Sequence, residues 1–284
     1  MHNGRWICVE GGFVRKGKYC EKCIGNMGFF GIFHGCQNGI LASFLLVVNN
    51  LFFRFLQKHY KLVDKFIAVS DFIKKKHIQT GFIDKDLKVN NNGINIDLIE
   101  KIKNSQSKQA YSSEMVFAGR VSDAKGAEVL KYIMSTMKHI KFHIIGDGPK
   151  LNELKKFSQI YNCNNVIFWG KQEYEKTLRI ISGAACTIVP SQMGEPFGLV
   201  AAESMALGVP VVSSNMGELN NLVSNGGGTV VEARKFKEFK ESIEEYLENH
   251  NKAKLAKKRG QEYVAKNLSI HSRVEVLTNI YKGL

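Results

Sequence analysis

The sequence predicts an α/β protein whose second half forms a doubly wound parallel sheet. From Glu114 onward, short apolar runs alternate with stretches of helical periodicity. The runs have no polar face, which is typical of strands buried on both sides in a parallel sheet. The chain has 284 residues, of which 44% are hydrophobic and 23% charged, so it can build one large core or two ordinary ones.

The second half of the chain reads as strands and helices in turn. Such alternation favours parallel strands joined by crossover helices. The last stretch, 238–284, is strongly charged and is predicted to be helical. We expect strands at 115–118, 142–145, 166–168, 185–189 and 210–213, and helices at 127–137, 150–161, 173–182 and 198–207.

The first part of the chain predicts a separate and incomplete unit. Two apolar runs, 65–69 and 87–89, flank a basic helix predicted at 71–80. The segment after them is rich in Asn, Ser, Gln and Lys, a composition typical of a linker. We therefore divide the chain into a partial first domain at 1–97, a linker at 98–112, a second domain at 113–265 and a C-terminal helix at 266–284. Whether that helix returns to the first domain is left open.

The chain is basic, with 40 Lys and Arg against 26 Asp and Glu, and its net charge is +14. This charge attracts acidic partners such as nucleic acid, anionic lipid or polyphosphate groups. Basic motifs interleaved with aromatic residues, which are typical of nucleic-acid binding, are not found, so we do not expect a nucleic-acid partner.

An apolar window at 40–56 contains Asn49, Asn50 and Arg54 and falls short of the roughly 20 residues that a spanning helix needs. No signal-peptide pattern leads the chain, so we expect a cytoplasmic protein. Two interpretations of this window stay open. It is a core helix beside a solvated basic face, or it docks with Lys74, Lys75 and Lys76 on an anionic membrane as a peripheral protein.

Four of the six cysteines, Cys8, Cys20, Cys23 and Cys36, lie in the first 36 residues. Four thiolates can close a tetrahedral structural zinc site. Small unligated apolar side chains and a redox pair are the alternatives. Cys163 and Cys186 are predicted to be core residues.

The pair Asp84 and Asp86 has the spacing of metal ligands. Because Lys85 lies between them, a solvated loop is the better interpretation.

The segment 190–199 follows a predicted strand and opens a helix that carries Glu203. A helix N-terminus beside Gly198 offers free backbone N–H groups and a positive dipole end, which suit a diphosphate. Glu195 and Glu203 are placed to accept hydrogen bonds from sugar hydroxyls. The chemistry predicted here is binding of a ligand that carries a diphosphate and sugar hydroxyl groups.

Two cations follow the first strand of the second domain. Arg120 comes directly after Gly119, and Lys125 precedes Gly126. Two cations at this position can bind an anionic ligand such as a diphosphate without a metal ion. Gly146 and Gly148 follow the next strand, where a tight turn explains them better than ligand contact.

The block from Pro190 to Val212, with seven residues between Glu195 and Glu203, resembles the donor-site signature of retaining glycosyltransferases of family four. The resemblance implies the GT-B fold of two Rossmann-like domains, with 1–97 as the remnant of the acceptor-side domain. It also implies that Glu195 holds the donor hexose and Glu203 the nucleotide ribose. His2 resembles a residue that faces the donor sugar. The resemblance thus gives a catalytic set of His2, Arg120, Lys125 and Glu195, and a donor-binding set of Gly119, Arg120, Lys125, Glu195, Phe197, Gly198, Leu199 and Glu203.

The sequence departs from that family at two places. Glu218 and Asn221 stand where Gly and Glu are usual, which concerns donor-sugar preference. Compared with that family, about half of the acceptor-side domain is expected before His2. Three explanations stay open: an N-terminally truncated enzyme, one piece of a split enzyme, or a misplaced start codon.

The predicted function is transfer of a sugar from a nucleoside-diphosphate sugar to a glycan or lipid-linked glycan. The anomeric configuration is retained, no cofactor is needed for the chemistry, and the pathway is cell-surface polysaccharide or glycolipid synthesis. The alternative is a catalytically silent fragment that binds the sugar nucleotide, or a subunit that works with a separate N-terminal half.

Overall fold

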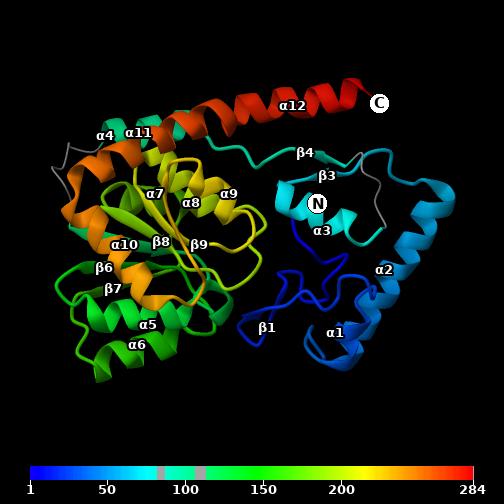
Figure 1. Cartoon of the computed structure of the whole chain (residues 1–284), viewed down its shortest axis with the longest axis horizontal. Coiled ribbons are helices and arrows are strands. Elements are labelled where there is room, and N and C mark those ends of the chain that lie inside the picture. The colour runs from blue at the N-terminus through cyan, green and yellow to red at the C-terminus, as the bar shows by residue number, and fades with distance from the viewer. Residues whose placement is uncertain (82–86, 106–112, 284) are drawn as a thin grey trace. The chain divides into compact units, whose positions relative to one another are not determined.

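A computed structural model describes residues 1–81, 87–105 and 113–283 (Figure 1). The chain folds as two units. Unit 1 contains Met1–Asn92, Met193–Phe197 and the chain from Arg273 onward. Unit 2 contains Gly93–Gln192 and Gly198–Ser272. The pair Asp84 and Asp86, considered above as metal ligands, lies outside the described residues.

Unit 2 is built on a sheet of six parallel strands, as the sequence predicts. The strands lie in the order β7, β6, β5, β8, β9, β10. The chain builds outward from β5 to β7, then returns to the other side of β5 and builds outward again to β10. The strands are β5 (Glu114–Ala118), β6 (Lys141–Ile145), β7 (Val166–Gly170), β8 (Cys186–Val189), β9 (Val211–Ser214) and β10 (Gly228–Val231).

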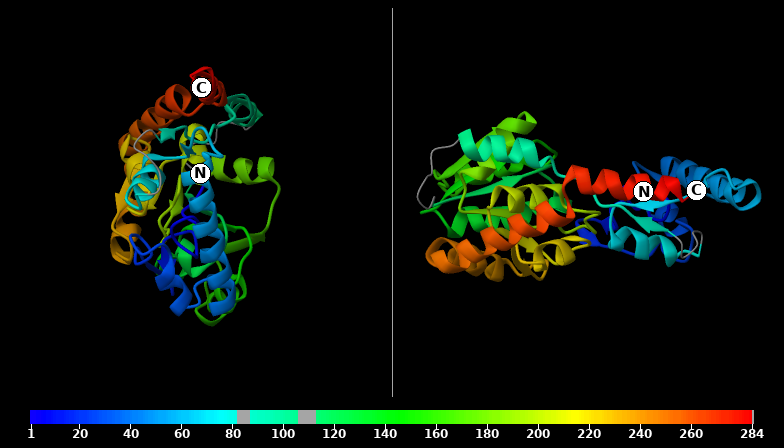
Figure 2. Two further views of the ribbon diagram at one scale, coloured as in Figure 1. Left: turned by 90° about the vertical axis from the view of Figure 1, so that its right-hand side faces the viewer. Right: turned by 90° about the horizontal axis from the view of Figure 1, so that it is seen from above.

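Helices lie against both faces of this sheet (Figure 2). Because both faces are covered, the strands are apolar throughout: Met115, Phe142 and Ile188 are fully buried in one continuous core. The helices of unit 2 are α4 (Ile96–Ser105), α5 (Ala127–Thr136), α6 (Leu151–Ile160), α7 (Tyr174–Ser182), α8 (Leu199–Leu207), α9 (Leu219–Ser224), α10 (Phe236–Glu248) and α11 (His250–Asn267), with a short 3-10 turn η1 at Asp123–Lys125.

The structure differs from the sequence expectation in three places. The predicted linker at 98–112 was wrong in its first part, because α4 buries Ile99 and Ile102 in unit 2. Strand β10 and helix α9 were not predicted. The charged C-terminal stretch is three helices, α10, α11 and α12 (Ile270–Lys282), and α11 begins where the Asn249 side chain accepts a hydrogen bond from Lys252 N.

Unit 1 has little regular sheet. Its two predicted strands and basic helix are confirmed as a parallel pair, β3 and β4, connected through α3. Residues before them form a short hairpin and two helices. The elements are β1 (Val14–Arg15), β2 (Lys18–Tyr19), α1 (Phe29–Phe33), α2 (Ile40–Tyr60), β3 (Ile67–Ala68), α3 (Asp71–Ile78) and β4 (Lys88–Val89).

The first residue of the chain lies beside β3. The Met1 ammonium donates to Ile67 O at 2.5 Å, and Val69 N donates to Met1 O at 3.2 Å. The main chain of Met1 therefore extends the parallel pair β3 and β4 on its open side. A small core of buried side chains, among them Phe13, Ile73 and Leu87, holds this unit together.

Helix α2 contradicts its interpretation as a core helix. It runs for 21 residues, so it is longer than the predicted window, and most of its surface is exposed. Among the described residues, it is the one helix long and apolar enough to cross a membrane by length and composition. Its length therefore meets the requirement that the sequence window seemed to miss.

Candidate functional site

The loops that carry the predicted donor motifs leave neighbouring strands of unit 2. Strands β5 and β8 are adjacent, and the strand order reverses between them. In doubly wound sheets, ligands bind beyond the carboxyl ends of the strands at this reversal. Gln192 N, after β8, donates to Ala124 O, after β5, at 2.8 Å. The structure therefore joins the two motif loops at the position where such folds bind ligands.

Glycine is required where these loops touch. At Gly126 the φ angle is +88°, and an added Cβ would lie 2.2 Å from Pro190 O. At Gly146 the φ angle is +128°, and an added Cβ would lie 1.9 Å from Gly119 O. Gly148 is crowded in the same way by Val121 O. The turn interpretation of Gly146 and Gly148 is confirmed, because both glycines support the loop after β5.

The two predicted cations follow β5. Arg120 is exposed and Lys125 is half-buried at the end of η1. Both belong to the loop that Gly119 begins and Gly126 ends. Both residues follow the carboxyl end of a strand, where an anionic ligand could bind. Contact of Arg120 and Lys125 with such a ligand stays a prediction.

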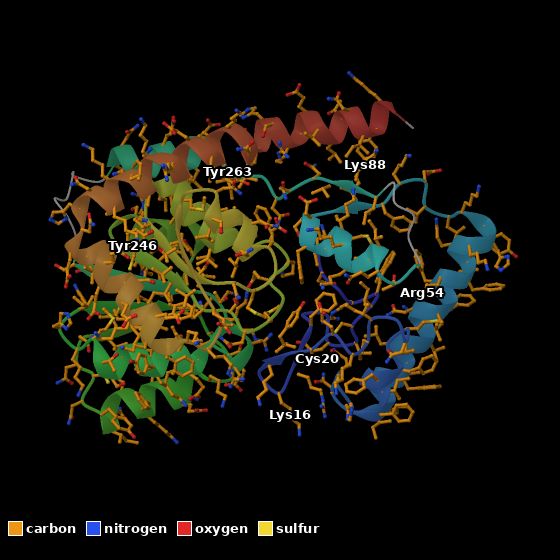
Figure 3. All side chains as sticks on the ribbon, in the orientation of Figure 1. Lys16, Cys20, Arg54, Lys88, Tyr246 and Tyr263 are labelled. Atoms are coloured by element: carbon orange, nitrogen blue, oxygen red, sulfur yellow. The ribbon has the colours of Figure 1, made fainter. Side chains whose placement is uncertain are left out.

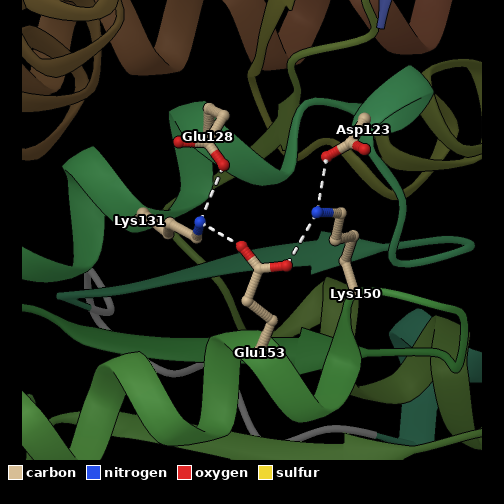
Figure 4. Close-up of polar contacts among 5 residues, drawn as sticks. All are labelled: Asp123, Glu128, Lys131, Lys150 and Glu153. Atoms are coloured by element: carbon tan, nitrogen blue, oxygen red, sulfur yellow. Dashed lines mark hydrogen bonds and ion pairs between the residues drawn. The ribbon is translucent and has the colours of Figure 1, made fainter. Parts of the chain in front are cut away.

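A network of ion pairs connects this loop to the two helices that follow it in the chain, α5 and α6 (Figure 4). Lys150 lies 3.5 Å from Asp123 Oδ1 and 2.7 Å from Glu153 Oε2. Lys131 pairs with Glu153 and, at 2.7 Å, with Glu128. Hydrogen bonds from Lys131 and Lys150 lower the pKa of Glu153 to about 2. The network ties η1 to α5 and α6.

Helix α8 is the next helix after β8, and Gly198 is its N-cap residue. The φ angle of Gly198 is +97°, and an added Cβ would lie 2.7 Å from Leu219 Cδ2. Glycine offers no side chain to cap the first N–H groups of the helix. Leu199, the first helical residue, is exposed. The first turn of α8 can therefore present backbone donors to an anion, as predicted for a diphosphate.

Glu203 lies one turn further along α8 and is buried, with 8% of its surface exposed. Its Oε1 accepts a hydrogen bond from Tyr174 Oη at 2.9 Å. Burial raises the pKa of Glu203 to about 7, and the hydrogen bond from Tyr174 acts in the opposite direction. A carboxyl group with a raised pKa is partly protonated near neutral pH. In its charged form it can accept hydrogen bonds from hydroxyl groups.

Tyr174 is a site residue that the sequence analysis did not find. It is the first residue of α7, after β7, and half of its surface is exposed while its hydroxyl reaches Glu203. Burial of the hydroxyl, with the Glu203 charge beside it, raises the pKa of Tyr174. No motif marks this residue in the sequence, since the contact depends on the packing of α7 against α8.

The other predicted donor residues lie in unit 1. The five-residue segment Met193–Phe197 belongs to this unit, with Glu195 and Phe197 both buried. Ser70 Oγ donates to Pro196 O at 2.5 Å, and Gly194 N donates to Gly12 O at 2.9 Å. Glu195 thus belongs to unit 1 and Glu203 to unit 2. The roles of the two acids stay predictions.

His2 is exposed and directly follows Met1, which is bonded to β3. The residue before it is therefore held in place. A role of His2 toward a donor sugar stays a prediction.

The four early cysteines are not gathered into one set of ligands. Cys8 and Cys23 are buried and share a hydrogen bond, which lowers the pKa of Cys8 to about 7. Cys20 and Cys36 are half-buried. Across the described ranges, no group of three or more His, Cys, Asp or Glu residues is placed to hold a metal ion. Of the three interpretations given above, the four-thiolate set is therefore not assembled among these residues.

The two residues at which the sequence departs from the family pattern, Glu218 and Asn221, follow β9 and contact each other. Glu218 is buried before α9, and Asn221 Nδ2 donates to Glu218 Oε1 at 3.4 Å. A glycine at 218 would remove the acceptor of this contact.

Comparison with known proteins supports the interpretation of unit 2. The family model of glycosyl transferases, group 1, matches residues 99–263, which is more than half of the chain. The uncharacterized glycosyltransferase MJ1069 of Methanocaldococcus jannaschii is 26% identical over 234 residues, which cover 79% of this chain and 60% of that protein. The chain therefore spans about 60% of the length of this curated relative.

Solved structures share the fold at low identity. Anabaena Alr3699/HepE in complex with UDP has a TM-score of 0.71 at 20% identity, and the match covers 85% of this chain and 68% of that one. A glycosyltransferase from Rickettsia africae has a TM-score of 0.71 at 19% identity, with 85% and 73% covered. The predicted GT-B fold class is confirmed by these neighbours. With the family model matched across the donor motifs, the chain belongs to the group 1 glycosyl transferases.

Proposed function

We propose that unit 2 binds the UDP part of a sugar nucleotide and that the chain acts in transfer of the sugar with retention. The observation that carries this proposal is the junction of the loops after β5 and β8 at the strand-order reversal. It places the Gly119–Lys125 loop and the start of α8 on adjacent strands. Alr3699/HepE, which shares the fold, has been solved with UDP and glucose.

The diphosphate would be held by complementary charge and by backbone donors. Arg120 and Lys125 supply two cations, and the first turn of α8 supplies N–H groups at a positive dipole end. As the bond between the sugar C1 and the phosphate oxygen breaks, UDP leaves with the electron pair. These groups would stabilise its growing negative charge.

Glu203 would accept hydrogen bonds from the ribose hydroxyl groups. Its two oxygens match a vicinal diol, and its hydrogen bond with Tyr174 fixes one of them. Glu195 would orient the donor hexose, with His2 facing the same sugar. As the new bond from the acceptor oxygen to C1 forms, the acceptor proton would pass to the departing phosphate on the same face.

A second function is favoured by the length of the chain, which spans 60% of the MJ1069 protein. In this function the chain binds the sugar nucleotide and leaves it unreacted. The acceptor, a glycan or lipid-linked glycan, a cytoplasmic location and a place in cell-surface polysaccharide or glycolipid synthesis all stay predictions.

Calorimetric titration of the full chain with UDP tests the donor site. We expect Glu203→Ala to weaken binding by about 1–3 kcal/mol, because it removes a charged acceptor from a buried position. Arg120→Ala should also weaken binding, while Lys155→Ala on the exposed side of α6 serves as a matched loss of positive charge. Equal affinity of Glu203→Ala and the unchanged chain would contradict the ribose role.

Turnover of radiolabelled UDP-glucose separates the two functions. Release of UDP, or transfer to added glycan acceptors, that disappears in Glu195→Gln supports transfer. UDP binding with no turnover in the same preparation supports the silent binding function.

A further inference from the structure

Two buried thiol groups of unit 1 lie in contact. Cys8 and Cys23 are 7 and 6% exposed, and their side chains share a hydrogen bond. The chain around them packs closely as well, because a Cβ added at Gly31 would lie 2.5 Å from Val9 Cγ2 and 3.5 Å from Cys23 Sγ. The residue that follows Cys8 and the sulfur of Cys23 thus adjoin the same glycine. The contact between the thiols is therefore part of a close fit between their two segments.

The main chain holds both sulfur atoms. The N–H groups of Gly11 and Phe13 donate hydrogen bonds to Cys8 Sγ, and Cys23 Sγ donates to Gly28 O at 3.9 Å. Both donors to Cys8 have positive φ angles, +93° at Gly11 and +53° at Phe13. Phe13 is buried in the core of unit 1, which holds this unusual backbone in place. N–H groups that converge on one atom favour negative charge there, and a charged sulfur is the reactive form of cysteine.

A short exposed hairpin connects the two cysteines. It consists of β1 and β2, with Lys16 at the turn and Cys20 directly after β2 (Figure 3). The loop that leads into the hairpin carries Gly12, whose carbonyl oxygen accepts the hydrogen bond from Gly194 N. A covalent bond between the two buried thiols would therefore fix the loop that contacts segment 193–197.

We propose that Cys8 and Cys23 are a redox-sensitive pair, which a peroxide oxidises to a disulfide bond and a thiol reductant opens again. The bond closes the chain between the two residues and holds the Gly12 loop firmly against segment 193–197. Formation of the bond depends only on unit 1. Its consequence for segment 193–197 rests on the proposed function, which assigns the donor hexose to Glu195 of that segment.

The oxidation takes place in two steps. The charged Cys8 sulfur attacks one oxygen of hydrogen peroxide, the O–O bond breaks, and hydroxide leaves and takes up the proton that Cys8 released. The Cys23 sulfur then attacks the sulfenic acid on Cys8, so that the S–S bond forms, the S–O bond breaks, and the hydroxyl group leaves as water with the Cys23 proton. Two thiols are oxidised and one peroxide is reduced to two water molecules. Both thiols are more than nine-tenths buried, so the oxidant must be as small as hydrogen peroxide.

Peptide mapping of the full chain tests the pair. The folded chain is treated with hydrogen peroxide and then unfolded while iodoacetamide blocks the remaining thiols. Trypsin cuts after Lys and Arg and separates the early cysteines onto three peptides, with Cys8 on 6–15, Cys20 on 19–22, and Cys23 with Cys36 on 23–54. Cys36→Ser leaves Cys23 as the one thiol of its peptide. Cys20→Ser is the matched loss of a neighbouring thiol, and Cys8→Ser removes the pair.

We expect mass spectrometry to find 6–15 joined to 23–54 in the unchanged chain, in Cys36→Ser and in Cys20→Ser, and to find the two peptides separate after dithiothreitol. Circular dichroism verifies that each chain is folded before treatment. Peptides that stay separate, a different pairing, or a pairing no more selective than that of the chain oxidised in urea overturns the proposal. So does a stoichiometric zinc ion that the unchanged chain binds and Cys8→Ser loses, since the thiols would then be metal ligands.

Hydrogen exchange tests the effect on segment 193–197. The Gly194 N–H donates to Gly12 O, so we expect its exchange to be slower in the oxidised chain than in the reduced chain. Peroxide should leave this exchange unchanged in Cys8→Ser. Equal or faster exchange in the oxidised chain overturns this part of the proposal. Calorimetry with UDP should give the same affinity in both states, because the proposed UDP site lies in unit 2. A failure of the redox pair is therefore distinguishable from a failure of the donor site.

Discussion

The two units place their polar and apolar residues in opposite ways. In unit 2, apolar strands fill the interior, and the predicted donor loops follow the neighbouring strands β5 and β8. In unit 1, the longest helix bonds through Asn50, Arg54 and Gln57 and turns Leu45 and Phe52 outward. Unit 2 thus follows the ordinary rule of burial, whereas α2 in unit 1 leaves apolar side chains exposed. An apolar helix pattern predicts that the helix will be covered, but it does not say which molecule covers it.

Alanine substitution of one glycine in each unit compares the two units and has the largest expected effect. Gly146→Ala in unit 2 should lower the free energy of unfolding by about 3 kcal/mol or more, because φ is positive and the new Cβ meets Gly119 O. Gly25→Ala in unit 1 also has a positive φ, but no atom lies within 4 Å of its added Cβ. We expect a loss of only about 1 kcal/mol there, from backbone strain alone. Urea unfolding followed by circular dichroism measures both losses.

Similar losses for the two alanine variants would contradict this expectation. They would mean that the loop after β5 can move away from Gly146, and that the loop is less rigid than its hydrogen bonds with Ile145 of β6 and with Gln192 imply. UDP titration of Gly146→Ala, under conditions where the variant is folded, then reports whether the loop still binds.

Glu203→Gln tests the functional edge of unit 2 by pH. Burial raises the pKa of Glu203 to about 7, whereas an unfolded Glu titrates near 4.3. The folded chain therefore binds more protons between these two pKa values, so its free energy of unfolding falls as the pH rises from about 4.3 to about 7. UDP affinity should change in the opposite direction, because the charged carboxylate is the better acceptor. We expect the Gln variant to lose both dependences and to bind UDP about 1–3 kcal/mol more weakly at about pH 8.

Calorimetry and urea unfolding at several pH values measure the two dependences. Tyr174→Phe is the matched control, since it keeps the carboxyl group and removes the hydrogen bond that favours its charged form. The apparent pKa should then rise. A pH dependence that persists unchanged in Glu203→Gln would assign it to another group.

Sequence reasoning predicted the regular part of the fold well, for a physical reason. Five of the strands in unit 2 were expected within a few residues because buried parallel strands are apolar throughout. Strand β10 was missed because Gly228 and Thr229 weaken its apolar run. Helix α4 was missed because a polar composition concealed Ile99 and Ile102, which lie on one buried face.

The candidate site was predictable where local chain geometry determines it. Gly126 and Gly198 mark positive φ angles next to the motif loops, and both can be found in the sequence. Tyr174 could not be found, because it reaches Glu203 only after two helices pack together. The early cysteines show the reverse case. Their spacing allowed a zinc site, unligated thiols or a redox pair, and only the fold shows that Cys8 and Cys23 lie together.

The orientation of α2 can be tested by exchanging polar and apolar residues on its two sides. Arg54→Leu should lower the free energy of unfolding by about 1–2 kcal/mol, because it removes the donor to Trp6 O from a partly buried position. Leu45→Gln on the exposed side of α2 should change the free energy of unfolding by no more than about 0.5 kcal/mol, since the Leu45 side chain is exposed. Thermal unfolding of the full chain measures both. The opposite order of effects would mean that α2 is buried through its apolar side.

The smallest effect is expected behind the donor loop, where Glu153→Gln removes the centre of an ion-pair network. Lys131 and Lys150 lower the pKa of Glu153 to about 2, so its contribution to stability is present above the unfolded pKa near 4.3 and is lost as the pH falls toward 2. The carboxyl group is exposed to solvent and salt, so we expect a loss of about 1 kcal/mol or less at neutral pH. Glu241→Gln, which breaks a single exposed pair with Lys237, is the control and should have no measurable effect. A loss for Glu153→Gln that high salt does not reduce would show that its side chain acts by packing α6 against α5, and the charge network would then have no part in holding the donor loop.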